Sequence, residues 1–513
     1  MAVWRSSMNT AAFERRQQNR SFRTLFLIEM WERFGYYGMA ALLVLFMVQE
    51  LGFDDARANL TWGAFTTLVY ASPAIGGWLG DRVLGTRRSM TMGAIILAIG
   101  YGLLSVPTAS MGFLYTALGV VVVGNGLFKS NAANLVRRIY EGDDARIDSA
   151  FTIYYMAVNI GSTASILLTP VIRSHFGWHA GFVVCLGGML VGLTNYWFMH
   201  RTLIRYGSNP DNEPVHLQRL SGALAGAAGL VVATVFLLQH RDMAVLSFFC
   251  AGLAIVVIFG YMIGTSRPDE RSGLIAVVIL TTQTILFFIF YQQMSTSLTL
   301  FALRNVEWEQ TLFGFTLFTW QPAQYQALNP IWIMVLSPIL AWWYSHQGQR
   351  GRDWPIAGKF ALGFAVVAIG FGIFGASQLF AHQGKVSSWL MIWGYGFYSL
   401  GELLVSGLGL AMISRYVPLR MSGFMMGAYF VGTGISQYLG SVVANFASVP
   451  HDITDPVVTL AVYTRLFLIL GGVAFVGTLL ALCLLPVMKR LPDTHASQNS
   501  RPIELATTAS VGP

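Results

Sequence analysis

Three charged side chains stand together in a stretch where most residues are apolar. The segment "IEMWERFGYYG", residues 28–38, contains Glu29, Glu32 and Arg33 at helical spacings of three and four, which places two acids and a base on one face of a helix. Tyr36 and Tyr37 follow one turn later. A carboxylate that can lose or gain a cationic neighbour can also take up and release a proton. This face is therefore a candidate for proton and charge exchange.

Four further polar side chains interrupt apolar runs elsewhere. Lys129 lies in "VGNGLFKSNAANL", Asn159 in "YYMAVNIGS" and Glu402 in "YSLGELLVSG", while Asn329 begins another run. The cations come from the first half of the chain and Glu402 from the second. A guanidinium and an ammonium suit a carboxylate, and carboxylate and amide oxygens suit an ammonium, so a zwitterion with separated charges would fit between them. Internal ion pairs that fix helix register are the alternative for any one residue.

The solvent around these groups follows from composition. Of the 513 residues, 55% are hydrophobic and 11% are charged, whereas a soluble chain is about 25% charged. Many apolar runs reach the roughly 20 residues that a helix needs to cross a bilayer, and continuous rather than alternating apolarity favours helices over a barrel. We predict an all-α integral membrane protein with 14 transmembrane helices, near 22-49, 58-80, 89-107, 112-136, 149-171, 180-200, 219-239, 243-264, 272-302, 327-345, 357-381, 388-414, 420-447 and 460-487.

The organisation of the chain follows from its charges. Basic residues crowd the N-terminus and every second loop, which by the positive-inside rule puts both termini in the cytoplasm. The net charge of +8 is then a topology signal, and no nucleic-acid partner is expected. We predict a cytoplasmic N-terminal segment (1-21), two six-helix bundles (22-200 and 272-488) around an inserted helix pair (219-264), and a cytoplasmic C-terminal tail (489-513).

Several classes of function fit the sequence poorly. The three cysteines lack metal or redox spacing, and the nine histidines form no H-E-x-x-H motif, so we expect no enzyme, no metal site and no cofactor. A receptor would need an output domain and a channel a through-pore. No obligate protein partner is evident beside the lipid bilayer.

Three motifs resemble a known family. The segment "EMWERFGYYG" is similar to the E-x-x-E-R-F-x-Y-Y-G signature of the proton-dependent oligopeptide transporters, a branch of the major facilitator superfamily. The segment "GGWLGDRVLGTRR" (76–88) looks like the superfamily's loop between its second and third helices, and "FTIYYMAVNIGS" (151–162) looks like the family's fifth-helix signature. The resemblance covers nearly the whole chain, includes the extra helix pair of bacterial members, and extends to the bacterial di- and tripeptide permeases. It implies the major facilitator fold.

The resemblance also implies roles for individual residues. Arg33 and Lys129 would bind a peptide carboxylate, and Asn159, Asn329 and Glu402 would receive its amino terminus. The substrate-binding set is completed by cavity-lining phenols, namely Tyr37, Tyr70 and Tyr155. The proton-coupling set would be Glu29, Glu32, Arg33 and Lys129. A cytoplasmic latch between helices would be formed by Asp81, Arg82, Arg87 and Arg88.

One departure from the family concerns the extracellular gate. Many members carry an Arg and a Glu at the positions that are Ala40 and Gln292 here. Both partners of that salt bridge are missing together, as expected because one alone would be a stranded buried charge. The gate must therefore close by other means.

The implied function is a proton-coupled symporter of the bacterial inner (plasma) membrane. It would import di- and tripeptides by alternating access, with broad side-chain selectivity because aromatic and small walls must tolerate many side chains, and with the proton gradient as its energy source. The alternative is a major facilitator transporter for another zwitterionic or amphiphilic solute, such as a peptide-like drug.

Overall fold

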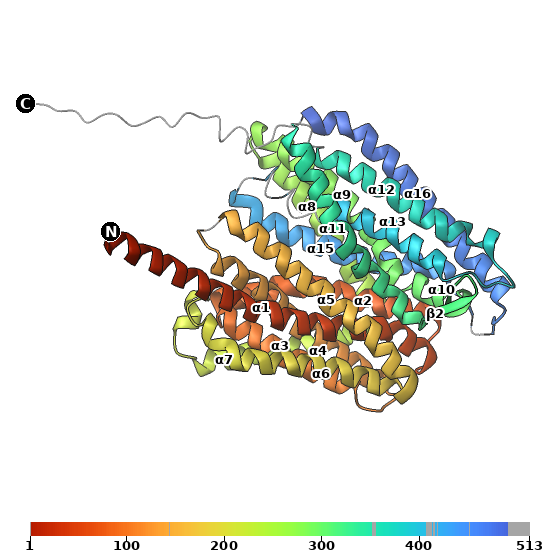
Figure 1. Ribbon diagram of the computed structural model, residues 1–513, viewed down its shortest axis with the longest axis horizontal. Coiled ribbons are helices and arrows are strands. Elements are labelled where there is room, and N and C mark those ends of the chain that lie inside the picture. Colours follow the sequence, from red (N-terminus) through yellow and green to blue (C-terminus); the bar gives the residue numbers. More distant parts are fainter. Residues whose placement is uncertain are drawn as a thin grey trace, which may run out of the picture.

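The computed structural model describes residues 2–142, 144–350, 355–406, 413, 416–417, 419–450 and 452–490. Long helices dominate it and form two groups that lie side by side (Figure 1). The first group consists of α1 (Ala2–Gln49), α2 (Asp55–Arg82), α3 (Thr86–Leu104), α4 (Met111–Ile139), α5 (Asp144–Phe176) and α6 (Trp178–Met199). The second consists of α9 (Pro268–Tyr291), α10 (Ser297–Asn305), α11 (Leu328–Gln349), α12 (Ile356–Gly375), α13 (Trp389–Val405), α15 (Leu419–Ala444) and α16 (Pro456–Arg490).

The predicted fold class, the major facilitator fold, is confirmed. Every predicted crossing coincides with a helix, and the crossing 388-414 can be followed continuously as far as Ser406. In the described part of the chain, nine helices are long and apolar enough to span a membrane on length and composition alone. Helix α1 is not among them because it carries the charged cluster of Glu29, Glu32 and Arg33, yet it packs directly against α5 and α6.

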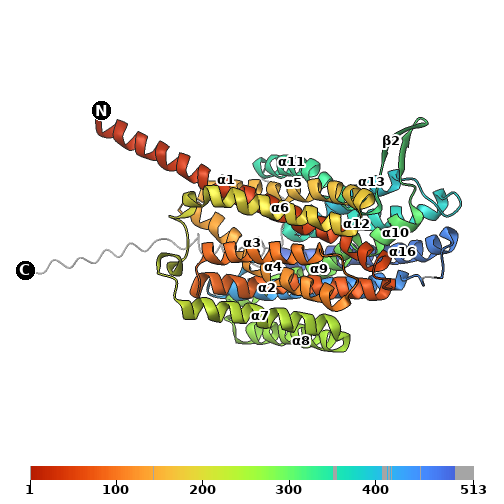
Figure 2. The same cartoon turned by 90° about the horizontal axis from the view of Figure 1, so that it is seen from below.

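Helices α7 (Leu217–Gln239) and α8 (Arg241–Thr265) form the predicted inserted pair. The pair lies at one edge of the molecule (Figure 2). Helix α7 packs against α4 and α2 of the first bundle, whereas α8 packs more lightly against α15 and α9 of the second. The short helices η1 (His200–Leu203) and η2 (Asn209–Asn212) lie in the segment that leads from α6 to α7.

Local structure differs from the sequence prediction in three places. Helix α1 begins at Ala2, so residues 2–21 are helical and continuous with the first crossing. The crossing 272-302 is broken between α9 and α10 by the short helix η3 (Gln292–Met294). A hairpin of β1 (Glu309–Leu312) and β2 (Phe315–Thr319) follows, with positive φ angles at the intervening Phe313 and Gly314. Of the predicted tail 489-513, residues 491–513 lie outside the described residues.

The remaining short helices are η4 (Pro322–Ala327) before α11, η5 (Ala376–Phe380) after α12, and η7 (Asn445–Ala447) after α15. The hairpin and α10 lie at the end opposite the N-terminus (Figures 1 and 2). With the termini cytoplasmic, this end is the extracellular side.

A glycine brings the charged helix α1 close to α5. A Cβ atom on Gly161 would lie 2.1 Å from the carbonyl oxygen of Met30, a distance no side chain can tolerate. The two backbones therefore approach more closely than larger residues would allow. This contact holds the acidic face of α1 beside Tyr154 of α5.

Candidate functional site

The charged residues of α1 form one buried cluster. Arg33 Nε lies 2.6 Å from Glu32 Oε2 and 3.1 Å from Glu29 Oε1. All three side chains are less than 5% exposed, and the Tyr154 hydroxyl of α5 donates a hydrogen bond to Glu29. One guanidinium faces two carboxylates. A change in the charge of either carboxylate therefore alters the strength of the ion pairs that bind Arg33.

A cavity of about 50 Å³ lies next to this cluster. Arg33 from α1 and Lys129 from α4 both line it, and the Lys129 ammonium lies 5.0 Å from the centre of the Tyr70 ring on α2. In the described part of the chain, none of the ion pairs within 4.0 Å includes Lys129. The basic end of the predicted site is thus assembled from three helices of the first bundle.

Three hydrogen-bond donors around this cavity are buried and have no partner among the described residues. They are Arg33 Nη2, Trp62 Nε1 and Gln437 Nε2, and the side chains of all three line the cavity. Buried donors are nearly always satisfied in native proteins, by protein, water or ligand. Because all three residues line one small space, an acceptor with two oxygen atoms, such as a carboxylate, would suit it.

The acidic end lies in an adjoining cavity of about 30 Å³, lined by Asn159, Asn329 and Glu402. Asn329 Nδ2 donates to Glu402 Oε2 at 2.7 Å and to Ser399 Oγ at 3.1 Å. Asn159 donates to the carbonyl oxygen of Tyr155 at 2.9 Å. Carboxylate and amide oxygens therefore gather at this end.

The two cavities share walls. Tyr37, Tyr291, Met294 and Gln326 line both, so the basic and acidic ends are separated by little more than these side chains. Tyr155 borders the acidic cavity and is 44% exposed. Together the cavities hold only a few waters, since a water occupies about 30 Å³ of liquid. The centre must widen to admit a larger solute.

The structure brings the predicted substrate-binding residues together as follows. Arg33, Tyr70 and Lys129 line the basic cavity, Tyr155, Asn159, Asn329 and Glu402 line the acidic one, and Tyr37 lines both. Glu29 and Glu32 lie beside the basic cavity through Arg33.

An ion pair joins the two bundles at the extracellular end of the molecule. Asp55, at the first turn of α2, accepts from Arg304, in the last turn of α10, through both oxygens at 2.6 and 2.8 Å. The Asp55 side chain is fully buried and also accepts from the backbone N–H of Val449, while Arg304 donates to the Tyr463 hydroxyl at 2.5 Å. Such a bidentate pair is specific in geometry.

Neutral hydrogen bonds link the bundles nearer to the cavities. The side-chain amide of Gln292 lies 3.3 Å from Thr66 Oγ1 of α2 and 3.1 Å from Ser441 Oγ of α15. Ala40 is buried and lines the basic cavity. The position where many family members carry Glu thus holds a neutral residue that links the bundles.

The predicted latch residues contact different partners. Asp81 accepts from Asn134 at 2.8 Å and pairs with Arg138 at 3.3 Å, both on α4. Arg87 and Arg88 instead enclose the segment between α6 and α7, where the buried Asp211 accepts from both of their backbone N–H groups.

The guanidinium groups of Arg87 and Arg88 donate to carbonyl oxygens of that same segment. Arg82 is exposed. Three of the four predicted residues therefore hold elements of the first bundle and the segment that follows it.

Among the residues that the structure describes, no group of three or more His, Cys, Asp and Glu side chains could hold a metal ion.

Several residues of the site were not predicted from the sequence. Asp55 and Arg304 are 249 positions apart, and their pairing could not be read from either alone. Arg304 did carry a signal, because it is a basic residue at the less basic side of the membrane. Tyr154 lies within the fifth-helix motif, but the family resemblance points to its neighbour Tyr155. Nothing in the sequence distinguishes Trp62 or Gln437 from ordinary packing residues.

The fold and the site define a class. Two helical bundles enclose buried charges of opposite sign, and an ion pair joins the bundles near one end of the molecule, which is the arrangement of a secondary transporter.

Comparison with known proteins identifies the family. The model of the POT family matches residues 87–465, and the chain belongs to this family. It is 41% identical to the dipeptide and tripeptide permease A of Salmonella typhimurium over 489 residues, which cover 94% of this chain and 96% of the relative. It is thus a multi-pass transporter of the bacterial inner membrane and not an enzyme.

Solved structures agree with this assignment. A bacterial homologue of the human drug peptide transporters PepT1 and PepT2 is 61% identical, with a TM-score of 0.85 over 93% of this chain and all of the other. The structure of tetrameric PepTSo2 is 60% identical, again with a TM-score of 0.85 and the same coverage.

Proposed function

We propose that this protein imports di- and tripeptides together with protons by alternating access. The observation that carries the proposal is that two cations, the buried Arg33 and the partly buried Lys129, line one cavity, while the buried Glu402 of the opposite bundle lines the adjoining one. A peptide is a zwitterion whose ends would reach both. The printed names of the relatives, dipeptide and tripeptide permeases and peptide transporters, support the same substrate class.

The basic cavity would receive the peptide carboxylate. Arg33 and Lys129 supply charge, while the unsatisfied donors of Trp62 and Gln437 supply directed hydrogen bonds. Two positive groups without further donors would hold any anion, whereas the added neutral donors fix the orientation of a planar carboxylate. Binding would also satisfy donors that are otherwise costly to bury.

The acidic cavity would receive the peptide amino group. Glu402 is oriented by the Asn329 amide, which leaves its other oxygen for the ligand. Asn159 lines the same cavity, and because its amide nitrogen is bonded to Tyr155, its side-chain oxygen would be available to the ligand. An ammonium with three donors fits these oxygens.

Proton coupling would act through the α1 cluster. Glu29 and Glu32 both hold Arg33, so a proton on either weakens that hold and frees the guanidinium for the peptide carboxylate. Peptide and proton then favour the same occluded state because each binds better when the other is present. No cofactor is needed, since the proton gradient supplies the energy.

The bond between Asp55 and Arg304 would serve as the extracellular gate. It joins the first turn of α2 to the end of α10, and therefore one bundle to the other, at the extracellular side. In this role it replaces the pair that is absent at Ala40 and Gln292. The latch around Asp81, Arg82, Arg87 and Arg88 would act by keeping the first bundle rigid while the bundles rock.

The test is uptake of labelled dialanine by the purified chain in liposomes, with and without an inward proton gradient. We expect accumulation only with the gradient. Glu32→Gln should abolish accumulation but retain exchange of dialanine across the membrane, because it removes the titrating group and leaves the binding residues. Glu309→Gln, on the exposed hairpin, is the matched control and should behave like the unchanged chain.

Two outcomes would contradict parts of the proposal. Gradient-driven accumulation by Glu32→Gln would remove Glu32 from proton coupling. No movement of dialanine under any gradient would overturn the substrate and favour another zwitterionic or amphiphilic solute.

A further inference from the structure

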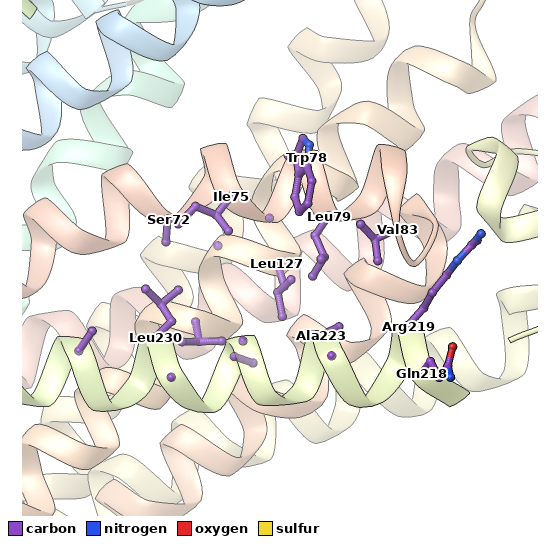
Figure 3. Close-up of a pocket in the computed structure, with 18 residues that line it drawn as sticks. Ser72, Ile75, Trp78, Leu79, Val83, Leu127, Gln218, Arg219, Ala223 and Leu230 are labelled. Carbon is purple, nitrogen blue, oxygen red and sulfur yellow. The ribbon is translucent and has the colours of Figure 1, made fainter. Parts of the chain in front are cut away.

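Two large apolar grooves lie on the first bundle, away from the central site. The first, of about 610 Å³, runs between α7 and the helices α2 and α4 (Figure 3). The second, of about 680 Å³, is lined by α3, α6 and the segment that leads into α7. Val83 and Arg219 line both grooves, so the grooves meet at these two residues.

The first groove owes its width to glycines. Gly222, Gly226 and Gly229 of α7 line it, and a Cβ atom on any of them would meet nothing within 4 Å. Small residues usually let membrane helices touch, but these face open space. The groove extends along α7 from Gln218 to Ala233, about 22 Å at 1.5 Å per residue, which exceeds the roughly 15 Å of hydrocarbon in one leaflet.

The polarity of the grooves changes along the membrane normal. Apart from Ser72, the walls of the first groove are apolar up to the point where the grooves meet, at the cytoplasmic start of α7. There Arg219 reaches toward the Val83 end of α2 (Figure 3). The second groove adds Arg87, Arg88, His200 and His216 near this point. Exposed Ile95 and Ile99 form its wall deeper in the membrane.

The charges at the meeting point leave a positive excess. Arg87, Arg88 and Arg219 face two carboxylates, Asp211 and Glu213. Asp211 is buried between the first two arginines, whereas the bond between Arg219 and Glu213, at 2.8 Å, is half-exposed on both sides. Exposed pairs contribute little, so Arg219 can exchange Glu213 for another anion at small cost.

From this geometry we propose that the grooves bind one anionic diacyl phospholipid of the cytoplasmic leaflet. One acyl chain fills each groove and the phosphate lies at Arg219. Hydrocarbon is the substance available at this depth, and two apolar channels that converge on one cationic point match a molecule with two chains and one anionic head. The lipid would fasten α7 to the first bundle, so that the inserted pair moves with it.

The test is native mass spectrometry of the full-length chain, delipidated in detergent and titrated with dioleoyl phosphatidylglycerol, dioleoyl phosphatidylcholine and monoacyl phosphatidylglycerol. We expect one retained molecule of the diacyl anionic lipid, bound at least fivefold more tightly than either of the others. Gly226→Leu and Gly222→Leu should each weaken it at least fivefold by filling the first groove. Arg219→Gln should remove the preference for phosphatidylglycerol over phosphatidylcholine.

Matched controls lie on the same helix pair. Gly260→Leu places the same side chain on α8, where a Cβ atom also meets nothing within 4 Å but no groove is lined, and Arg241→Gln removes a charge from the opposite end of the pair. Both should bind lipid like the unchanged chain.

Three results would overturn the proposal. Equal binding of diacyl and monoacyl lipid would exclude the two-chain arrangement, and unchanged binding by both glycine variants would exclude the first groove. If the glycine variants instead altered the oligomeric state without altering lipid retention, a second copy of the chain would be the occupant.

Discussion

The extracellular gate offers the most direct test of the mechanism, through Asp55→Asn. This change leaves an oxygen for the Val449 N–H but removes the charge opposite Arg304. Breaking one side of a buried pair costs about 3 to 5 kcal/mol. The Arg304 side chain is 18% exposed and can regain some water, so we take the lower value of about 3 kcal/mol.

The cost of the unpaired Arg304 charge destabilises only the closed state, because Arg304 is partly buried beside Asp55 only while the gate is closed. At about 1.4 kcal/mol per tenfold change, the equilibrium moves about a hundredfold toward the extracellular-open state. If about 99% of the unchanged molecules are closed, about half of the Asp55→Asn molecules would be open. The double variant Asp55→Asn with Arg304→Gln removes both charges and should recover most of the closed population, because no charge is stranded.

The assay is the distance between spin labels on cysteines placed at Ala109 and Leu379. Both are exposed positions on the extracellular side, one in each bundle. The exposed Cys250 and Cys483 would first be replaced by serine. We expect a second, longer distance in Asp55→Asn that largely disappears in the double variant. Equal opening in both variants would refute the reasoning, since the stranded charge would then not be the cause.

Further expectations concern the cavities and the neutral part of the gate. Arg33→Ala should weaken inhibition by a free dipeptide far more than by its C-terminal amide, and equal loss for both would remove Arg33 from carboxylate binding. Glu402→Gln should impair competition by free dipeptides but not by acetylated ones; an unchanged ratio would exclude it as the amino-group site. Gln292→Ala loses two neutral hydrogen bonds worth about 1 kcal/mol each, so spin-label distances should show less opening than in Asp55→Asn.

Much of the fold could be predicted from the sequence because the bilayer imposes a simple rule. Apolar runs of sufficient length become helices, and the buried charges of α1 could be recognised because they violate that rule. The spacing of Glu29, Glu32 and Arg33 also fixed their shared face, since neighbours three and four apart meet on any helix. Local sequence periodicity is sufficient to predict both the membrane helices and the shared face of these charges.

The gate could not be predicted by the same means. Asp55 and Arg304 lie at helix ends in segments that look like ordinary membrane borders, and their bond depends on how two bundles dock. The interruption of the helix at Gln292 could not be recognised in the sequence, because the surrounding run remains apolar from α9 into α10. The short hairpin carries few apolar residues in alternation, and its strands are almost entirely exposed, so no buried face marks it.

Charge balance explains why a proton and a carboxylate should travel together. The basic end contains two cations, Arg33 and Lys129, and two acids, Glu29 and Glu32, within electrostatic reach of one another. An arriving peptide carboxylate adds a third negative charge to a buried cluster, which is costly unless it is neutralised. A proton on Glu29 or Glu32 restores the charge balance of the cluster. It also frees Arg33 to bind the peptide carboxylate. At the acidic end the peptide ammonium offsets the charge of Glu402, so that end requires no further ion when a free peptide binds.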